Sequence, residues 1–282
     1  MIHNEKISMD IERTMTSNPP QLVAFCQGKE KHPIKPQDIP KTQSQFYQGT
    51  GQKKNMGFLV LHGFSATPFS MHRITQALAA QGHTVLAPLL AGHGQSVQDF
   101  AQSQWQDWQC SAYEAFKQIS EKCDRVSVIG LSMGGALALN LAADSNEVLN
   151  LFLLAPAVYP PWQLKYSYPL LSPLSHWGLR SIPTKGGNFA DASQIDYQYP
   201  VMPLSALKAL SDLMTHTQSR LSQVTTPTVL FWGEKDKVLP RTNSEHLLNQ
   251  IKGKKSELIL LPKSKHVLSL DYEVGQIIQR IG

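Results

Sequence analysis

Cysteines, long apolar runs and clustered charges are all scarce in this 282-residue sequence. The three cysteines, Cys26, Cys110 and Cys123, have neither C-x-x-C nor Cys/His spacing, which argues against a disulfide framework and against a metal site. The longest apolar runs, such as 149–158 and 229–232, are far shorter than the roughly 18 residues that cross a bilayer. We therefore expect no transmembrane helix and no bound metal.

The charge pattern gives little support for a nucleic-acid partner. The formal net charge is +5, but the basic residues are scattered except for Lys252, Lys254 and Lys255, a short cluster typical of a solvated surface beside a helix end. The first ten residues contain acids and lack the apolar core of a secretory signal. We expect a cytoplasmic protein that does not bind nucleic acid, and the sequence is silent on its oligomeric state.

Strand and helix patterns alternate along most of the chain, which predicts the α/β class. Apolar residues make up 41% and charged residues 17%, values typical of a folded globular protein. Such alternation specifies a doubly wound, mainly parallel sheet with right-handed crossovers. The expected strands are 57–62, 83–87, 125–130, 150–155, 227–232 and 257–261. The expected helices are 69–80, 105–120, 133–143, 243–251 and one from about 272.

The alternation is interrupted twice, which suggests three parts. Residues 1–55 are expected to form an N-terminal arm with possible edge strands. Residues 56–158 and 222–282 are expected to form the α/β core. Residues 159–221, rich in Pro, Tyr and Trp, are expected to be a loop-rich cap or lid inserted over the strand ends. The aromatic cap residues could line a pocket or touch a lipid surface.

The strongest chemical signal is the pentapeptide Gly-Leu-Ser-Met-Gly at 130–134, between a predicted strand and a predicted helix. A G-x-S-x-G motif in that context is typical of a sharp turn that exposes a nucleophilic serine, here Ser132. Small neighbours such as Gly130 and Gly134 provide the space that such a strained turn needs. The alternative is a Gly/Ser turn that merely links strand to helix.

A nucleophilic serine needs a base, and position selects one of the ten histidines. His266 follows the last predicted strand and should lie at the same sheet edge as Ser132. By contrast, His62, His83 and His93 precede Ser132, against the chain order serine, acid, histidine that accompanies this motif. His266 is therefore the predicted base.

The acid that orients the base should follow a strand between these two residues. Asp236 meets that condition on a loop after 227–232, and Glu234 is the rival. Asp236 is preferred because the acid usually lies a few residues beyond the strand end. Either carboxylate could instead be a solvated turn residue or a helix N-cap.

The oxyanion of an acyl-transfer reaction needs two preorganised donors. The backbone N–H of Met133, next to the nucleophile, is one candidate, and the N–H of Phe64, after the flexible Gly63, is the other. His62 is expected to hold this loop by hydrogen bonds. The side chains of Phe64, Met133 and Val267 are expected to help bind the substrate in an apolar pocket.

In these motifs the chain resembles the small microbial carboxylesterases and monoacylglycerol lipases of the α/β-hydrolase superfamily. The matching stretches are 62–64, 92–94, 130–135, 236–240 and 264–267. The resemblance implies a Ser132, Asp236, His266 triad, an oxyanion hole from Phe64 and Met133, and a cap between the sixth and seventh strands. No cofactor is required.

The predicted function is hydrolysis of short- to medium-chain carboxylic esters through an acyl-enzyme intermediate on Ser132. Two alternatives use the same fold. One is another serine-dependent reaction, such as thioester or C–C bond hydrolysis, because a fold hosts many functions. The other is a binding protein that has lost catalysis, against which the complete set of three residues argues.

Overall fold

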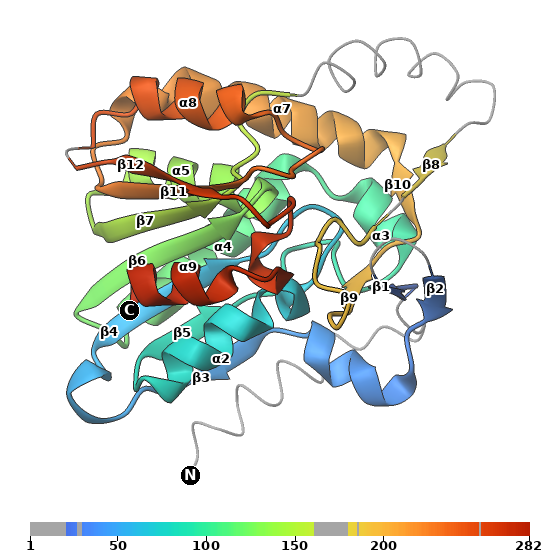
Figure 1. Cartoon of the computed structure of the whole chain (residues 1–282), viewed down its shortest axis with the longest axis horizontal. Helices are drawn as coiled ribbons and strands as arrows, with labels where there is room; N and C mark the ends of the chain where they lie inside the picture. Colours follow the sequence, from blue (N-terminus) through green and yellow to red (C-terminus); the bar gives the residue numbers. More distant parts are fainter. Residues whose placement is uncertain (1–20, 27–29, 161–179, 185, 254) are drawn as a thin grey trace.

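A seven-stranded, mainly parallel sheet forms the centre of this computed structural model, which describes residues 21–26, 30–160, 180–184, 186–253 and 255–282 (Figure 1). The strand order is β12-β11-β7-β6-β4-β5-β3, and only the edge strand β3 is antiparallel to its neighbour. This architecture confirms the predicted fold class. The strands of this sheet are β3 (Gln45–Tyr47), β4 (Met56–Leu61), β5 (Thr84–Ala87), β6 (Arg125–Leu131), β7 (Val148–Leu154), β11 (Thr228–Gly233) and β12 (Glu257–Leu261).

The central strands are apolar on both faces because helices cover both. In β4, Phe58 and Val60 point into one core cluster, whereas Leu59 and Leu61 point into the other. This alternation follows from the two-residue period of a strand. The sheet therefore separates two cores, as expected for a doubly wound fold.

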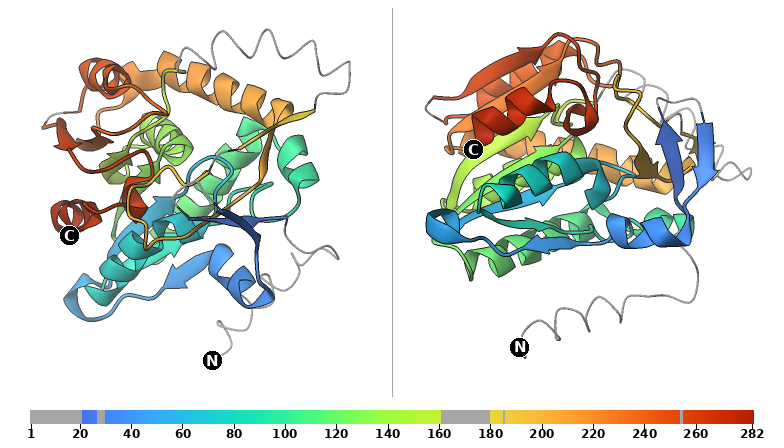
Figure 2. Two further views of the ribbon diagram at one scale, coloured as in Figure 1. Left: turned by 45° about the vertical axis from the view of Figure 1, so that its right-hand side comes forward. Right: turned by 60° about the horizontal axis from the view of Figure 1, so that its bottom comes forward.

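Helices pack in layers against the two faces of the sheet (Figure 2). On one face α4 and α7 both contact α5, and on the other α2 contacts α9. Within the described ranges, no helix is long and apolar enough to cross a membrane. The α-helices are α2 (His72–Ala80), α3 (Val97–Gln102), α4 (Trp105–Ser120), α5 (Met133–Asp144), α7 (Leu204–Arg220), α8 (Arg241–Gln250) and α9 (Val274–Ile281). The 3₁₀ helices are η1 (Pro36–Thr42), η2 (Gly51–Lys53), η3 (Pro68–Met71), η5 (Leu221–Gln223) and η6 (Leu268–Leu270).

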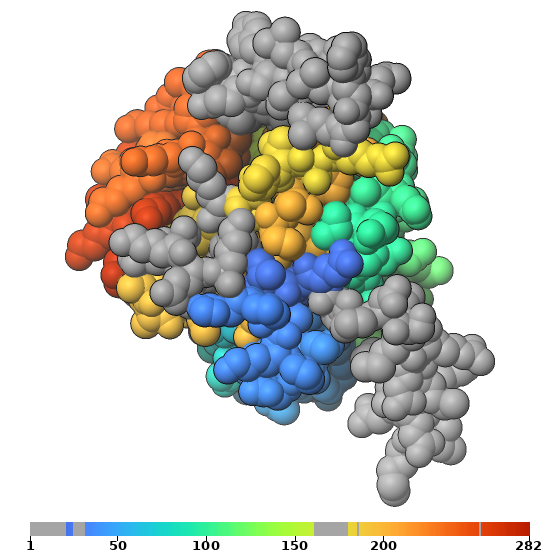
Figure 3. Space-filling model, turned by 90° about the vertical axis from the view of Figure 1, so that its right-hand side faces the viewer, coloured from blue at the N-terminus to red at the C-terminus, as the bar shows by residue number. Residues whose placement is uncertain are grey.

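Strands from the N-terminal part and from the expected cap pair with each other outside the main sheet. The antiparallel pair β1 (Val23–Cys26) and β2 (Glu30–Pro33) is extended by β9 (Asp196–Gln198). A separate pair joins β8 (Ser181–Pro183) to β10 (Val201–Pro203). Figure 3 shows the blue N-terminal residues beside the yellow segment that carries β8 and β9. The N-terminal part and the cap thus share one small sheet.

Most predicted elements agree with the structure to within a few residues, but one prediction is wrong. The stretch 159–221, expected to be a loop-rich insertion, contains the 17-residue helix α7 (Leu204–Arg220). Its buried residues, including Leu210 and Leu213, pack against the core through α5. The prolines upstream of α7 dominate the composition of the stretch as a whole. The regular spacing of apolar residues within α7 is therefore not evident from that composition.

His62 connects two loops at the carboxyl edge of the sheet. Its fully buried ring donates from Nδ1 to the Gly63 carbonyl at 2.9 Å and accepts at Nε2 from the Leu90 N–H at 3.2 Å. Burial lowers the pKa of His62 from its ordinary 6.5 to about 4. His93, whose ring centroid lies 5.1 Å away, has a pKa lowered by burial in the same direction. The predicted role of His62 in holding its loop agrees with these contacts.

This environment predicts that the protein loses stability when the pH falls below 6.5. Between pH 6.5 and about 4 the unfolded chain binds a proton at His62 that the folded chain does not, so acid favours unfolding. From pH 7 to pH 5 we expect this residue to lower the free energy of unfolding by about 2 kcal/mol. Urea unfolding of wild type and His62→Gln at both pH values measures the difference.

The substituted protein should be less stable at pH 7, because buried donors and acceptors lose partners. Its free energy of unfolding should also depend less steeply on pH than that of wild type. Some dependence remains, because His93 contributes in both proteins. An equal dependence in the two proteins would contradict the assignment of the acid sensitivity to His62.

Candidate active site

Ser132 occupies a strained turn between β6 and α5. Its φ of 53° and ψ of −112° lie outside the regions that a non-glycine residue usually adopts. The turn is held from both sides. The Ser132 N–H donates to the Leu154 carbonyl at 2.9 Å, and the Ser132 carbonyl accepts from the N–H groups of Gly135 and Ala157, each at 2.9 Å. These bonds fix the hydroxyl above the strand ends.

Two glycines allow this turn to exist. A Cβ atom on Gly130 would overlap the carbonyl group of Gly134, and a Cβ on Gly134 would overlap the carbonyl oxygen of Leu61. Helix α5 therefore approaches the backbone of β4 and β6 more closely than any side chain permits. Its N-terminus, the positive end of the helix dipole, begins directly after Ser132.

The structure brings His266 and Asp236 to Ser132. The Nε2 atom of His266 lies 2.9 Å from Ser132 Oγ, and its Nδ1 lies 2.8 Å from Asp236 Oδ2. A neutral imidazole that donates from Nδ1 to Asp236 accepts at Nε2 from the serine hydroxyl. Of the histidines in the described part of the chain, His266 alone bonds Ser132, which agrees with its selection from chain order.

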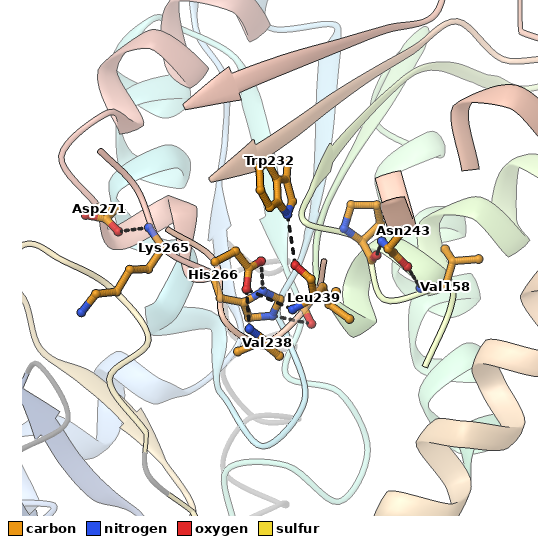
Figure 4. A network of polar contacts seen from close by, with 11 residues as sticks. Val158, Trp232, Val238, Leu239, Asn243, Lys265, His266 and Asp271 are labelled. Carbon is orange, nitrogen blue, oxygen red and sulfur yellow. Dashed lines mark hydrogen bonds and ion pairs between the residues drawn. The ribbon is translucent and has the colours of Figure 1, made fainter. Parts of the chain in front are cut away.

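Asp236 lies on the turn after β11 with its side chain fully buried. Its Oδ1 atom accepts from the N–H groups of Val238 at 2.7 Å and Leu239 at 3.0 Å, which leaves Oδ2 for His266. Figure 4 shows Val238 and Leu239 beside His266. The rival Glu234 is exposed to solvent. The turn thus presents one carboxylate oxygen to the imidazole and ties the other to the backbone.

The two predicted oxyanion donors follow β4 and Ser132. Among the loop and turn hydrogen bonds of the described residues, neither the Phe64 N–H nor the Met133 N–H donates to a backbone acceptor. The Phe64 ring packs at 4.9 Å from Phe100 and 5.9 Å from Trp108, measured between centroids. Aromatic packing therefore fixes the loop that carries the Phe64 amide.

The side chains predicted to bind substrate differ in exposure. Phe64 is half-buried and adjoins the larger core cluster. Met133 is fully buried in that cluster, and Val267 is buried in the other. Among the three side chains, that of Phe64 exposes the largest apolar surface. The side chain of Met133 is buried, so its predicted contribution is the backbone N–H.

Two residues that the sequence did not single out hold the surroundings of the site. Asn243 on α8 accepts at Oδ1 from the Tyr159 N–H at 2.8 Å and donates from Nδ2 to the Pro156 carbonyl at 2.7 Å, so it fixes the chain as it leaves β7. Figure 4 shows its contact with Val158, whose N–H donates to the same Oδ1 at 3.3 Å. Tyr199 donates its N–H to the Ser65 carbonyl at 3.2 Å and its hydroxyl to the Gly92 carbonyl at 2.8 Å. Both contacts join distant segments, which local sequence patterns do not report.

The chemistry available at this site is that of a serine nucleophile with a histidine base. Within the described ranges, no group of three or more His, Cys, Asp or Glu side chains is arranged to hold a metal ion. The chain of hydrogen bonds from Asp236 through His266 to Ser132 is the arrangement that removes a proton from a serine hydroxyl as it attacks a carbonyl group.

Known proteins match most of the chain in sequence. The "Thermostable monoacylglycerol lipase" of Bacillus sp. (strain H-257) is 30% identical over 237 residues, which cover 83% of this chain and 91% of that protein. The "Carboxylesterase" of Bacillus subtilis (strain 168) is 21% identical over 76% of this chain and 86% of that protein.

A solved chain from the study of LipS and LipT, two metagenome-derived lipolytic enzymes, superposes with a TM-score of 0.80 at 28% identity, covering 86% of this chain and 96% of that one. The model of the hydrolase family described as "Serine aminopeptidase, S33" matches residues 52–273. The chain therefore belongs to this family of α/β-hydrolases.

Proposed function

We propose that this protein is a serine carboxylesterase, similar to a monoacylglycerol lipase, that hydrolyses short- to medium-chain carboxylic esters. The observation that carries the proposal is the line of hydrogen bonds from Asp236 through His266 to Ser132 at the carboxyl ends of the strands. The lipase and esterase names of the relatives support ester hydrolysis. The family's description also names an aminopeptidase, so amide substrates belong in the test.

In the proposed reaction, Ser132 Oγ attacks the ester carbonyl while His266 Nε2 takes its proton. The imidazolium is stabilised by Asp236 and then protonates the alcohol as it leaves. Water, deprotonated by the same imidazole, hydrolyses the acyl-enzyme and returns Ser132 to its starting state. In each half of the cycle, His266 Nε2 acts first as the base and then as the acid.

The negative charge on the carbonyl oxygen would be stabilised by the N–H groups of Phe64 and Met133. Both are backbone donors on fixed segments, so they need no reorganisation during the reaction. The dipole of α5 acts in the same direction at Met133. The apolar surface of Phe64, together with the predicted contributions of Met133 and Val267, would favour uncharged acyl chains over polar ones.

The first prediction concerns the nucleophile and the substrate class. Wild type should hydrolyse p-nitrophenyl esters with an optimum at short to medium acyl length, and Ser132→Ala should lower kcat by about 10³-fold or more, because attack then depends on water alone. A spectrophotometric panel of graded esters, an acyl thioester and an aminoacyl p-nitroanilide separates the candidate reactions. Circular dichroism checks that the substituted protein folds.

A flat profile across acyl lengths would contradict the proposed apolar pocket. Preference for the thioester or the anilide would replace the ester assignment. Absence of turnover, together with no labelling of Ser132 by a fluorophosphonate, would favour a binding protein.

The second prediction concerns the acid. In Asp236→Asn, the amide oxygen should remain on the N–H groups of Val238 and Leu239, which turns the NH₂ group toward His266 Nδ1. The imidazole is then forced into the tautomer that cannot accept the Ser132 proton. We expect kcat for p-nitrophenyl esters to fall by about 10³- to 10⁴-fold with little change in the unfolding temperature.

Glu234→Gln is the matched control, since it neutralises an exposed carboxylate two residues away. Its activity should stay within about twofold of wild type, because an exposed charge contributes little. An equal loss in both variants would exclude a specific role for Asp236.

A further inference from the structure

We propose that Asp271 is a positioning residue that fixes the loop of His266 and joins it to the segment Asn188–Ala190 of the expected cap. The inference rests on the proposed role of His266 as the base. It assigns to this part of the cap a second task besides covering the site, because the segment becomes part of the support of the imidazole.

Asp271 is fully buried, and both its carboxylate oxygens accept hydrogen bonds from backbone N–H groups. Its Oδ2 accepts from Lys265 at 2.7 Å and from Ala190 at 2.9 Å, and its Oδ1 accepts from Tyr272 at 2.9 Å. Figure 4 shows Asp271 reaching the backbone of Lys265, next to His266. One oxygen atom thus bridges the histidine loop and the cap segment.

Two more contacts join the same segments. The Val267 N–H donates to the Asn188 carbonyl at 2.8 Å, and Lys265 Nζ donates to the Phe189 carbonyl at 3.2 Å. Phe189 itself is fully buried in the core cluster that also contains Val267. The residues on either side of His266 are therefore both bonded to Asn188–Ala190, and that segment is anchored by its own aromatic ring.

The position of this loop matters because both imidazole nitrogens are in use. His266 must keep 2.8 Å to Asp236 and 2.9 Å to Ser132 at once, although these partners come from different loops. A misplacement of about 1 Å can cost about 10²-fold in rate. Loss of the Asp271 bridge would free the backbone next to His266 without touching Ser132 or Asp236.

A second buried carboxylate holds the beginning of the same loop in a different way. Glu273 Oε2 accepts from the Lys263 N–H at 2.8 Å and from Ser264 Oγ at 2.7 Å. Because one oxygen makes both bonds, a glutamine can retain them with its amide oxygen. An asparagine at position 271 could likewise keep the bonds to Lys265 and Ala190 with its amide oxygen and place its NH₂ group against the Tyr272 N–H. An alanine at this position removes the bridging oxygen.

The test compares Asp271→Ala with Glu273→Gln in the full chain. Each substitution neutralises one buried carboxylate near the loop, but only Asp271→Ala removes the oxygen that bridges Lys265 and Ala190. Three readouts are measured: kcat and KM for p-nitrophenyl acetate, the low-field proton NMR signal of the His266 Nδ1–H, and amide hydrogen exchange of the peptides that span 186–193 and 262–270.

We expect Asp271→Ala to lower kcat by about tenfold or more with KM within about twofold, since positioning of the base affects chemistry and not binding. The Nδ1–H signal should weaken, and both peptides should exchange faster together. Glu273→Gln should lose no more than about threefold in kcat and keep the signal. Equal losses in the two variants, or unchanged exchange of 186–193 in Asp271→Ala, would overturn the proposal.

Lys265→Met provides a milder variant should Asp271→Ala fail to fold. It removes only the contact to the Phe189 carbonyl, and faster exchange at both peptides with a lowered kcat is the expected result. Unchanged exchange and an unchanged kcat would count against the proposal that residues 188–190 support the loop of His266. The NMR and exchange readouts do not depend on ester turnover, so a protein that hydrolyses no ester refutes the proposed function and leaves the role of Asp271 measurable.

Discussion

The close approach of helix α5 to the backbone of β4 and β6 is the constraint on which the rest of the site depends. It requires glycine at positions 130 and 134, because any side chain there would overlap a main-chain carbonyl group. Ser132, which lies between these two glycines, has a positive φ, and α5 begins directly after it. The position of Ser132 and that of the helix dipole thus depend on the same packing requirement.

Buried carboxylates hold the loops around this turn, and each of them accepts at least one hydrogen bond from a backbone amide. Asp236 ties its own turn through Val238 and Leu239, while Asp271 and Glu273 tie the loop before and around His266. Such hydrogen bonds to carboxylate oxygens are short and directional. They give irregular segments a fixed shape that apolar burial, which is not directional, cannot provide.

The sequence predicts best what depends on local patterns. The helix expected over 105–120 coincides with α4, and the strand–turn–helix context of Ser132 follows from residues that adjoin it. Distance from a strand end favours Asp236 over Glu234, and the structure places Asp236 on His266. These inferences succeed because parallel strands deliver their following loops to one edge.

Features that join distant segments could not be predicted in this way. The pairing of β1 with β9 links residues more than 170 positions apart, and Asn243 bonds residues more than 80 positions away. Neither the strand pairing nor the Asn243 hydrogen bonds follow a fixed spacing that could be recognised in a single sequence. Helix α7 was missed for a different reason, since its apolar period was masked by the proline-rich composition of the preceding residues.

The contacts of residues 188–199 have a consequence for changing this enzyme by recombination. This stretch begins with bonds to the backbone beside His266 and ends with the bond from Tyr199 to the loop after β4. A chimera that exchanged everything between β7 and β11 for the corresponding region of a relative would also exchange these attachments. Crossover points that retain residues 186–203 would keep these attachments, so that residues taken from a relative would join a chain whose bonds beside His266 are intact.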